Sequence, residues 1–158
     1  MRRFFVALFC TVALAFAEPR ATHVAISSRT GVTADKLTIQ QSQSQPQPVF
    51  PVSAVVLSTV AGTVRVEHSG TAPTTTAATP SPTISGGSAS SILAYTNSNV
   101  GAGTVASVTY TLQAGVPLTL DMSTMAFSGS GATKNITVVV ALGSSGDVQT
   151  ALYWKEGQ

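Results

Sequence analysis

The chain has 158 residues, of which 44% are hydrophobic and only 9% are charged, with a formal net charge of +2. This length suits one domain of ordinary size, and the apolar content is sufficient for a core. The single cysteine excludes a disulfide framework within one chain and a cysteine-based zinc site, and two distant histidines do not suggest a histidine metal site. We therefore expect neither a cofactor nor a bound metal.

The first residues have the pattern of a secretory signal peptide. Arg2 and Arg3 precede an apolar run over residues 4–16, and a small-x-small site ends at Ala17. The run is shorter than the roughly 20 apolar residues that a membrane span needs, so we expect no span in the mature chain. Cleavage after Ala17 would place the protein outside the cell or on its surface. The alternative is that residues 1–17 form a buried N-terminal segment.

Residues 18–51 are expected to form an extended arm or linker. Two short strands are predicted within it, at residues 22–27 and 36–40. Residues 40–48 are rich in Gln and Ser, contain two prolines and have no large apolar side chain. Such a stretch cannot bury enough surface to offset the entropy lost on ordering, and arms of this kind commonly reach onto neighbouring subunits.

Residues 52–158 have the pattern of an all-β domain. Val64 and Val66 alternate with Arg65 and Glu67, which is the period of a strand with one buried face. No apolar pattern with a period of 3.6 residues occurs after residue 17. We predict an antiparallel β-sandwich or jelly-roll that follows the N-terminal arm.

Two hairpins are predicted in the second half of this domain. In the first, alternating apolar residues at 108–112 and 116–122 flank a loop at residues 113–115. Pro117 cannot donate a ladder hydrogen bond, so its strand is expected to be an edge strand or to begin there. In the second hairpin, residues 136–142 and 148–154 flank a Gly- and Ser-rich loop at residues 143–147.

Few residues could carry catalytic chemistry. Residues 69–120 contain no charged side chain, so these 52 consecutive positions supply no acid, base or metal carboxylate. The remaining candidates are scattered: His23, Asp35, Glu67, His68, Asp121, Asp147 and Glu156. The two aspartates Asp121 and Asp147 lie at strand ends or turns, where Asp usually accepts hydrogen bonds from backbone amides. We predict no catalytic, cofactor-binding or metal-ligating residue and no enzymatic activity.

A serine–histidine–acid arrangement through His68 remains formally open, but the sequence contains no Gly-x-Ser-x-Gly elbow. A small secreted enzyme is therefore the last of three alternatives. Nucleic-acid binding is disfavoured, because the chain without residues 1–17 has equal numbers of basic and acidic side chains. Asn135-Ile136-Thr137 matches a glycosylation sequon, although we expect an asparagine at the start of a strand.

Four aromatic residues are the candidate interface residues: Tyr95, Tyr110, Tyr153 and Trp154. Exposed aromatic side chains can stack on a sugar or anchor a protein partner. Tyr153 and Trp154 are neighbours on a predicted strand, so they point to opposite faces. One of them is therefore expected in the core and the other at the surface.

The low charge and the abundance of Thr, Ser, Ala and Gly favour a protein that packs against copies of itself or on a larger surface. The strand and turn usage of GTVRVE (62–67), AGVPLTL (114–120) and ALYW (151–154) resembles that of small β-sandwich decoration or fibre proteins of virions, notably of tailed phages. The resemblance covers about two thirds of the chain, from Phe50 to the end. It implies a structural subunit and no site residues. The signal-peptide pattern departs from it, because virion proteins are normally assembled without secretion.

We therefore predict a non-enzymatic structural protein, a β-sandwich subunit of a surface or virion assembly of the decoration, fibre or coat type. Its partners would be further copies of itself or other assembly subunits. The alternative is a secreted module that binds a glycan or a cell surface, which a cleft lined by Tyr95, Tyr110 or Trp154 would favour. The expected location is extracellular, surface-exposed or in a virion.

Overall fold

The computed structural model describes residues 22–41, 49–69, 83–85, 92–96, 105–106, 108–124 and 135–156. These residues form strands that pair only antiparallel, and none of them belongs to a helix. The strands are β1 (Thr22–Gln41), β2 (Val49–Ser58), β3 (Gly62–Ser69), β4 (Thr83–Ser85), β5 (Ile92–Thr96), β6 (Val105–Ala106), β7 (Tyr110–Leu112), β8 (Leu118–Asp121) and β9 (Asn135–Glu156). The predicted all-β antiparallel fold is confirmed. The predicted signal peptide at residues 1–17 lies outside the described residues, as do residues 42–48 of the Gln-rich stretch. Within the described part of the chain, no helix has the length and apolarity of a membrane span.

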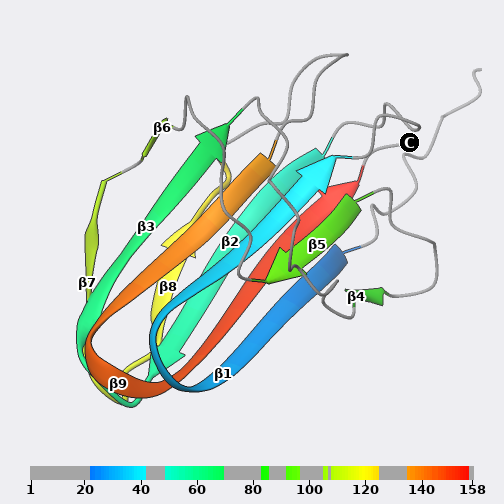
Figure 1. The fold of residues 1–158 in the computed structure, drawn as a ribbon. Helices are drawn as coiled ribbons and strands as arrows, with labels where there is room; N and C mark the ends of the chain where they lie inside the picture. Colours follow the sequence, from blue (N-terminus) through cyan, green and yellow to red (C-terminus); the bar gives the residue numbers. More distant parts are fainter. Residues whose placement is uncertain are drawn as a thin grey trace, which may run out of the picture.

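The long strands β1 and β9 pair with each other along almost their whole length (Figure 1). Residues 22–29 of β1 pair with residues 148–155 of β9, and residues 34–40 of β1 pair with residues 135–141. Between these two stretches the register shifts, and both ribbons bend sharply. Each strand therefore contributes one half to each side of the bend.

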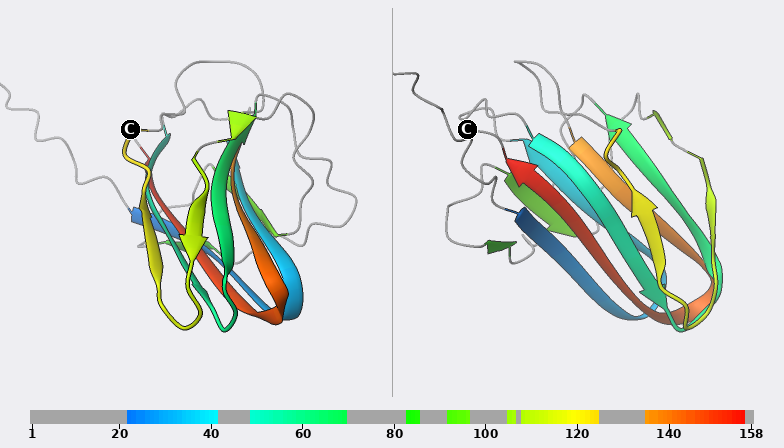
Figure 2. Two further views of the ribbon diagram at one scale, coloured as in Figure 1. Left: turned by 90° about the vertical axis from the view of Figure 1, so that its left-hand side faces the viewer. Right: turned by 180° about the vertical axis from the view of Figure 1, so that it is seen from behind.

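The bend divides the pairing into two layers that face each other (Figure 2). In the first layer the order is β4, β1, β9, β2 and β8. In the second layer the order is β5, β1, β9 and β3, and β3 then pairs with both β6 and β7. β1 and β9 thus occupy central positions in both layers.

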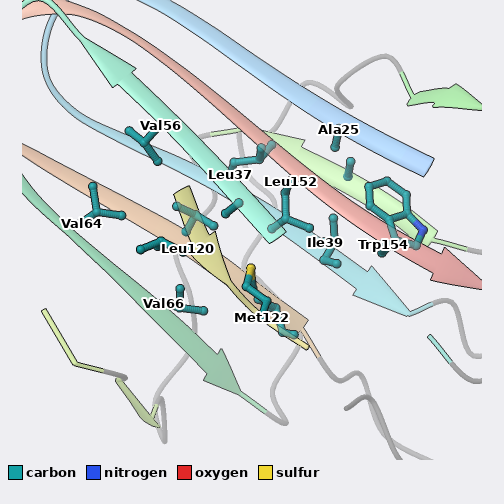
Figure 3. Packing of buried hydrophobic residues seen from close by; sticks show 14 of the residues in the cluster. Ala25, Leu37, Ile39, Val56, Val64, Val66, Leu120, Met122, Leu152 and Trp154 are labelled. Carbon is teal, nitrogen blue, oxygen red and sulfur yellow. The ribbon is translucent and has the colours of Figure 1, made fainter. Parts of the chain in front are cut away.

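The hydrophobic core lies between the two layers (Figure 3). Alternate residues of each strand point inward, as the two-residue period of a strand requires. Inward side chains that are at most 4% exposed come from both layers: Ala25, Ala54, Val56, Leu120, Leu152 and Trp154 from the first, and Leu37, Ile39, Val64, Val66, Leu112, Val138 and Val140 from the second. Complete burial of one such large side chain is worth about 1.5–3 kcal/mol. This core holds the two layers together.

The prediction of an extended arm over residues 18–51 is wrong for most of that range. Residues 22–41 form β1, which pairs with β9 on one side and with β4 and β5 on the other. The two predicted short strands are the two ends of this one strand. The sequence pattern does not show that the two segments form one strand, because the inward positions nearest the bend are the polar Ser27 and Asp35, which are both 1% exposed. These polar residues interrupt the apolar alternation without interrupting the strand.

The prediction of a hairpin around residues 143–147 is also wrong. The two flanking segments do not pair with each other, since both pair with β1 and the chain runs on through a bend within β9. Backbone hydrogen bonds join the bend to the connection between β2 and β3. Gly143 N donates to Ala61 O at 2.9 Å, and Thr59 N donates to Asp147 O at 3.0 Å. The same Gly- and Ser-rich composition suits a bend and a hairpin loop, so local pattern alone does not separate them.

The turn at residues 113–115 connects the two layers and does not close a hairpin ladder. β7 pairs with β3 in the second layer, whereas β8 pairs with β2 in the first. Gly115 adopts a φ of 72° and donates its N–H to Ser58 O at 2.7 Å, a backbone conformation that glycine adopts without strain. β8 begins directly after Pro117, and within the described residues it pairs with β2 alone. The prediction that the strand of Pro117 is an edge strand or begins there agrees with β8 in both respects.

Replacing Gly62 with alanine is expected to lower the free energy of unfolding by about 1–3 kcal/mol or more. Gly62 lies opposite Leu142, and an added Cβ would overlap the carbonyl oxygen of Ala141 and approach the Cα of Leu142 to 3.0 Å. Because these atoms belong to the backbone of β9, the strands must separate to admit the methyl group. The melting temperature measures the effect.

Gly143→Ala is the matched control for this substitution. A Cβ at that position comes no closer than 3.4 Å to Ala61 O, so its effect on the melting temperature should be clearly smaller. Equal melting temperatures for the two variants would contradict the close approach of β3 and β9 at Gly62.

Candidate functional site

One buried polar cluster joins the start of β1 to the end of β9. His23 lies opposite Trp154 in the ladder, and their rings stack with centroids 5.6 Å apart and an interplanar angle of 16°. Trp154 Nε1 donates to Glu156 Oε1 at 3.0 Å, and His23 Nε2 lies 3.7 Å from the same oxygen. The three residues are 1%, 0% and 8% exposed, respectively. This cluster is packed into the interior and offers no open surface to a substrate.

A second buried cluster lies nearer the bend and centres on Asp35. Ser27 Oγ donates to Asp35 Oδ1 and Thr150 Oγ1 donates to Asp35 Oδ2, each at 3.0 Å. All three residues point between the layers and are at most 1% exposed. Both carboxylate oxygens therefore accept a hydrogen bond from the opposing segments of β1 and β9, which suits a structural role.

The two aspartates predicted to bond backbone amides do so. Asp147 Oδ1 accepts from Gly31 N at 3.0 Å, and Asp121 Oδ1 accepts from Ser123 N at 2.9 Å. The hydrogen bond from the Ser123 backbone, helped by the Ser123 hydroxyl, lowers the pKa of Asp121 below its ordinary value of 3.8. Asp121 lies opposite Ser53 in the middle of β2, whereas Asp147 lies level with Thr59 just beyond its end, which places the two aspartates roughly 20 Å apart or more. They are too distant to act as a hydrolytic pair.

The remaining ionisable candidates, Glu67 and His68, lie on β3. Glu67 Oε1 accepts from Arg65 Nε at 2.6 Å on the outer side of the second layer. His68 is exposed at the end of the ladder, opposite Ile136. Within the described residues, no three His, Cys, Asp or Glu side chains gather as they would around a metal ion.

The four candidate interface aromatics do not share one surface. Trp154 is completely buried and therefore has no side chain available to a partner, which corrects its assignment as an interface residue. Its neighbour Tyr153 is partly exposed on the opposite face, as the strand period predicts. Tyr95 is partly exposed on β5 of the second layer, and Tyr110 is 39% exposed on β7. The structure thus brings none of these side chains together to line a cleft.

The sequon at residues 135–137 is also unsuited to modification in the folded chain. Asn135 is 1% exposed and Thr137 is completely buried, with its Oγ1 2.8 Å from Thr38 Oγ1. Asn135 begins β9. This agrees with the predicted role of an asparagine at a strand start.

The outer face of the first layer is weakly charged. Its side chains come from the outward positions of four adjacent strands: Val24, Ile26 and Ser28 of β1; Gln149, Ala151, Tyr153 and Lys155 of β9; Ser53, Val55 and Leu57 of β2; and Thr119 and Asp121 of β8. These four strands lie side by side in the view from behind in Figure 2, where they run in colour from blue (β1) and red (β9) to teal (β2) and yellow (β8). Ile26 is 38% exposed and Leu57 is 36% exposed.

Comparison with known proteins gives no guide to this surface. No protein-family model, curated protein or solved structure matches the chain.

The sequence pattern did not single out the outer face of the first layer. The alternation of each strand identifies its outward residues, but the face exists only because β1, β9, β2 and β8 are neighbours. The outer face of the second layer differs in charge, since it carries Lys36, Arg65 and Glu67 on β1 and β3. The two outer surfaces of the protein are therefore chemically distinct.

Proposed function

We propose that the protein is a non-enzymatic structural subunit, a β-sandwich of jelly-roll type that acts through protein–protein contacts in a surface or virion assembly. The strand order supports the finer fold. When the halves of β1 and β9 are counted separately, one layer runs β1, β9, β2, β8 and the other runs β1, β9, β3, β7, which is the order of an eight-stranded jelly-roll. Jelly-rolls build both capsid and lectin domains, so the fold alone does not decide between assembly and binding.

The observation that carries the proposal is the outer face of the first layer. Val24, Ala151, Tyr153 and Val55 form its middle, and its charged side chains, Lys155 and Asp121, lie at its margins. The apolar side chains of the face adjoin one another across neighbouring strands, and an apolar patch of roughly a few hundred Å² on a monomer is often functional. A sheet face with this composition suits a subunit that covers it with another protein.

The arrangement of the ionisable groups supports a non-enzymatic role. Among the described residues, Asp35 and Glu156 are buried and bonded within the core, and Asp147 is bonded to a backbone amide. An acid–base mechanism needs such groups within reach of a bound substrate. The partly exposed tyrosines give less support to the alternative glycan-binding module, because Tyr95, Tyr110 and Tyr153 lie on three different strands and line no common cleft.

The oligomeric state of the protein purified from its native source tests the proposal. We expect particles that contain several copies of the chain, or the chain together with other assembly subunits, by light scattering and electron microscopy. The intact mass of the same sample shows whether residues 1–17 have been removed. A monomer at every concentration, combined with binding on a glycan array, would instead support the secreted binding module.

A further inference from the structure

We infer that the outer face of the first layer binds a second copy of this chain through a two-fold contact. This inference rests on the proposed function and names the partner for that surface.

The two charged side chains of the face have opposite signs and lie apart. Lys155 is outward on β9 opposite Phe50, and Asp121 is outward on β8 opposite Ser53, with β2 between the two strands. Two strand spacings across and two residues along place them about 12 Å apart. Within the described residues these two side chains form no ion pair with each other.

A two-fold axis that lies in the plane of the face, and that relates two copies of the chain, can bring these separated charges into pairs. When the axis crosses the face between Lys155 and Asp121, Lys155 of each copy comes over Asp121 of the other. Because a two-fold interface is isologous, every contact occurs twice, so two ion pairs form. The low pKa of Asp121 keeps its carboxylate ionised over the whole neutral range. The apolar side chains beside the axis, among them Tyr153 and Val55, then meet apolar side chains of the second copy.

The face is electrostatically neutral, which favours a second copy over a strongly charged partner. The charged groups of a partner rich in one sign of charge would lose their hydration where they meet the apolar side chains of Val24, Ile26 and Ala151. In return, such a partner would find only one side chain of opposite charge on the face. A second copy instead presents matching apolar residues and both complementary charges. Complementary potentials of this kind chiefly set specificity and register.

The area of the face predicts a weak contact. Four strands of about 4.8 Å spacing and seven residues of about 3.3 Å each give a projected area on the order of 400 Å². Each partner in a standard stable interface buries about 800 Å². The face alone therefore supports a dimer that dissociates on dilution, as suits one of several contacts that a subunit makes within an assembly.

Sedimentation equilibrium of the full chain over a range of concentrations tests the inference. We expect a reversible monomer–dimer equilibrium in the range of about 10–100 µM. Lys155→Asp and Asp121→Lys should each weaken dimerisation roughly tenfold or more, since each change places two like-charge pairs in the contact. The double reversal should restore the dissociation constant to within about threefold of the original, because it restores both pairs.

Two further variants separate this surface from others. Ile26→Lys places a charge in the exposed part of the face and should abolish the dimer, whereas Thr63→Lys on the exposed outer side of β3 should leave it unchanged. The fluorescence of Trp154, the only tryptophan, verifies that each variant has folded. A dimer insensitive to all changes on the face would overturn the inference but not the proposed function. A chain that remains monomeric to about 1 mM and is monomeric in its native source would overturn both.

Discussion

Replacing Trp154 with alanine is expected to lower the free energy of unfolding by about 3–5 kcal/mol. Trp154 is completely buried and contacts the core at the place where the start of β1 meets the end of β9. The substitution leaves a large cavity and removes the ring that stacks on His23. It also removes the Nε1 donor to Glu156, so a buried carboxylate loses a hydrogen bond, which itself costs stability. Urea denaturation followed by circular dichroism measures the change without relying on tryptophan fluorescence.

Tyr153→Ala is the matched control for this prediction. It removes an aromatic ring from the adjacent position of the same strand, but on the partly exposed outer face. Its cost should therefore be well below that of Trp154→Ala, because less surface is lost from the interior. Trp154→Phe should fall between the two, since it keeps most of the packing and removes the bond to Glu156. An unchanged urea midpoint for Trp154→Ala would show that the ring is not part of the core.

The sequence predicts those features of this fold that depend on local pattern. The alternation of residues 62–67 places Val64 and Val66 inward in the structure, at 0% and 1% exposure. The missing N–H of Pro117 predicts an edge strand or a strand start, and β8 begins directly after it. The period of two separates the partly exposed Tyr153 from the buried Trp154. Each of these predictions needs only a residue and its immediate neighbours, so each can be made without knowledge of the pairing.

The features that depend on distant pairing could not be predicted in this way. Residues 22–41 resemble an arm because Ser27 and Asp35 occupy inward positions, and only Thr150 on β9 explains how those polar groups are satisfied. Similarly, residues 143–147 have the composition of a hairpin loop. They form a bend because both flanking halves of β9 pair with β1. A bend within one strand and a hairpin loop have the same local turn chemistry, so the pairing with distant strands decides which of the two forms.

The candidate site was missed for the same reason. Lys155 and Asp121 share one face only because β2 lies between their strands. His23 and Glu156 likewise come together only through the register of β1 and β9. In a sheet protein, the composition of a face depends on strand order. A single strand's alternation identifies which residues point outward, but not which other residues they meet.

Asp35→Ala is expected to lower the free energy of unfolding by about 2–4 kcal/mol. The carboxylate accepts hydrogen bonds from Ser27 and Thr150 within the core, and bonds to a charged group are worth about 1.5–3 kcal/mol each. Its removal leaves two buried hydroxyl groups without an acceptor. The substitution also removes the free-energy cost of burying a carboxylate, which offsets part of that loss. Chemical denaturation with a two-state analysis measures the difference.

Asp35→Asn separates hydrogen bonding from charge at this position. The amide oxygen can accept from one hydroxyl group, and the amide nitrogen can donate to the other, because a hydroxyl group both donates and accepts. The Asn variant should therefore retain most of the stability that the Ala variant loses. A gain in stability for Asp35→Ala would contradict this account, since it would mean that burying the carboxylate costs more than its two hydrogen bonds return. The expected loss follows instead from geometry: the two donors come from opposite strands, and Asp35 ties β1 to β9 beside the bend on which both layers depend.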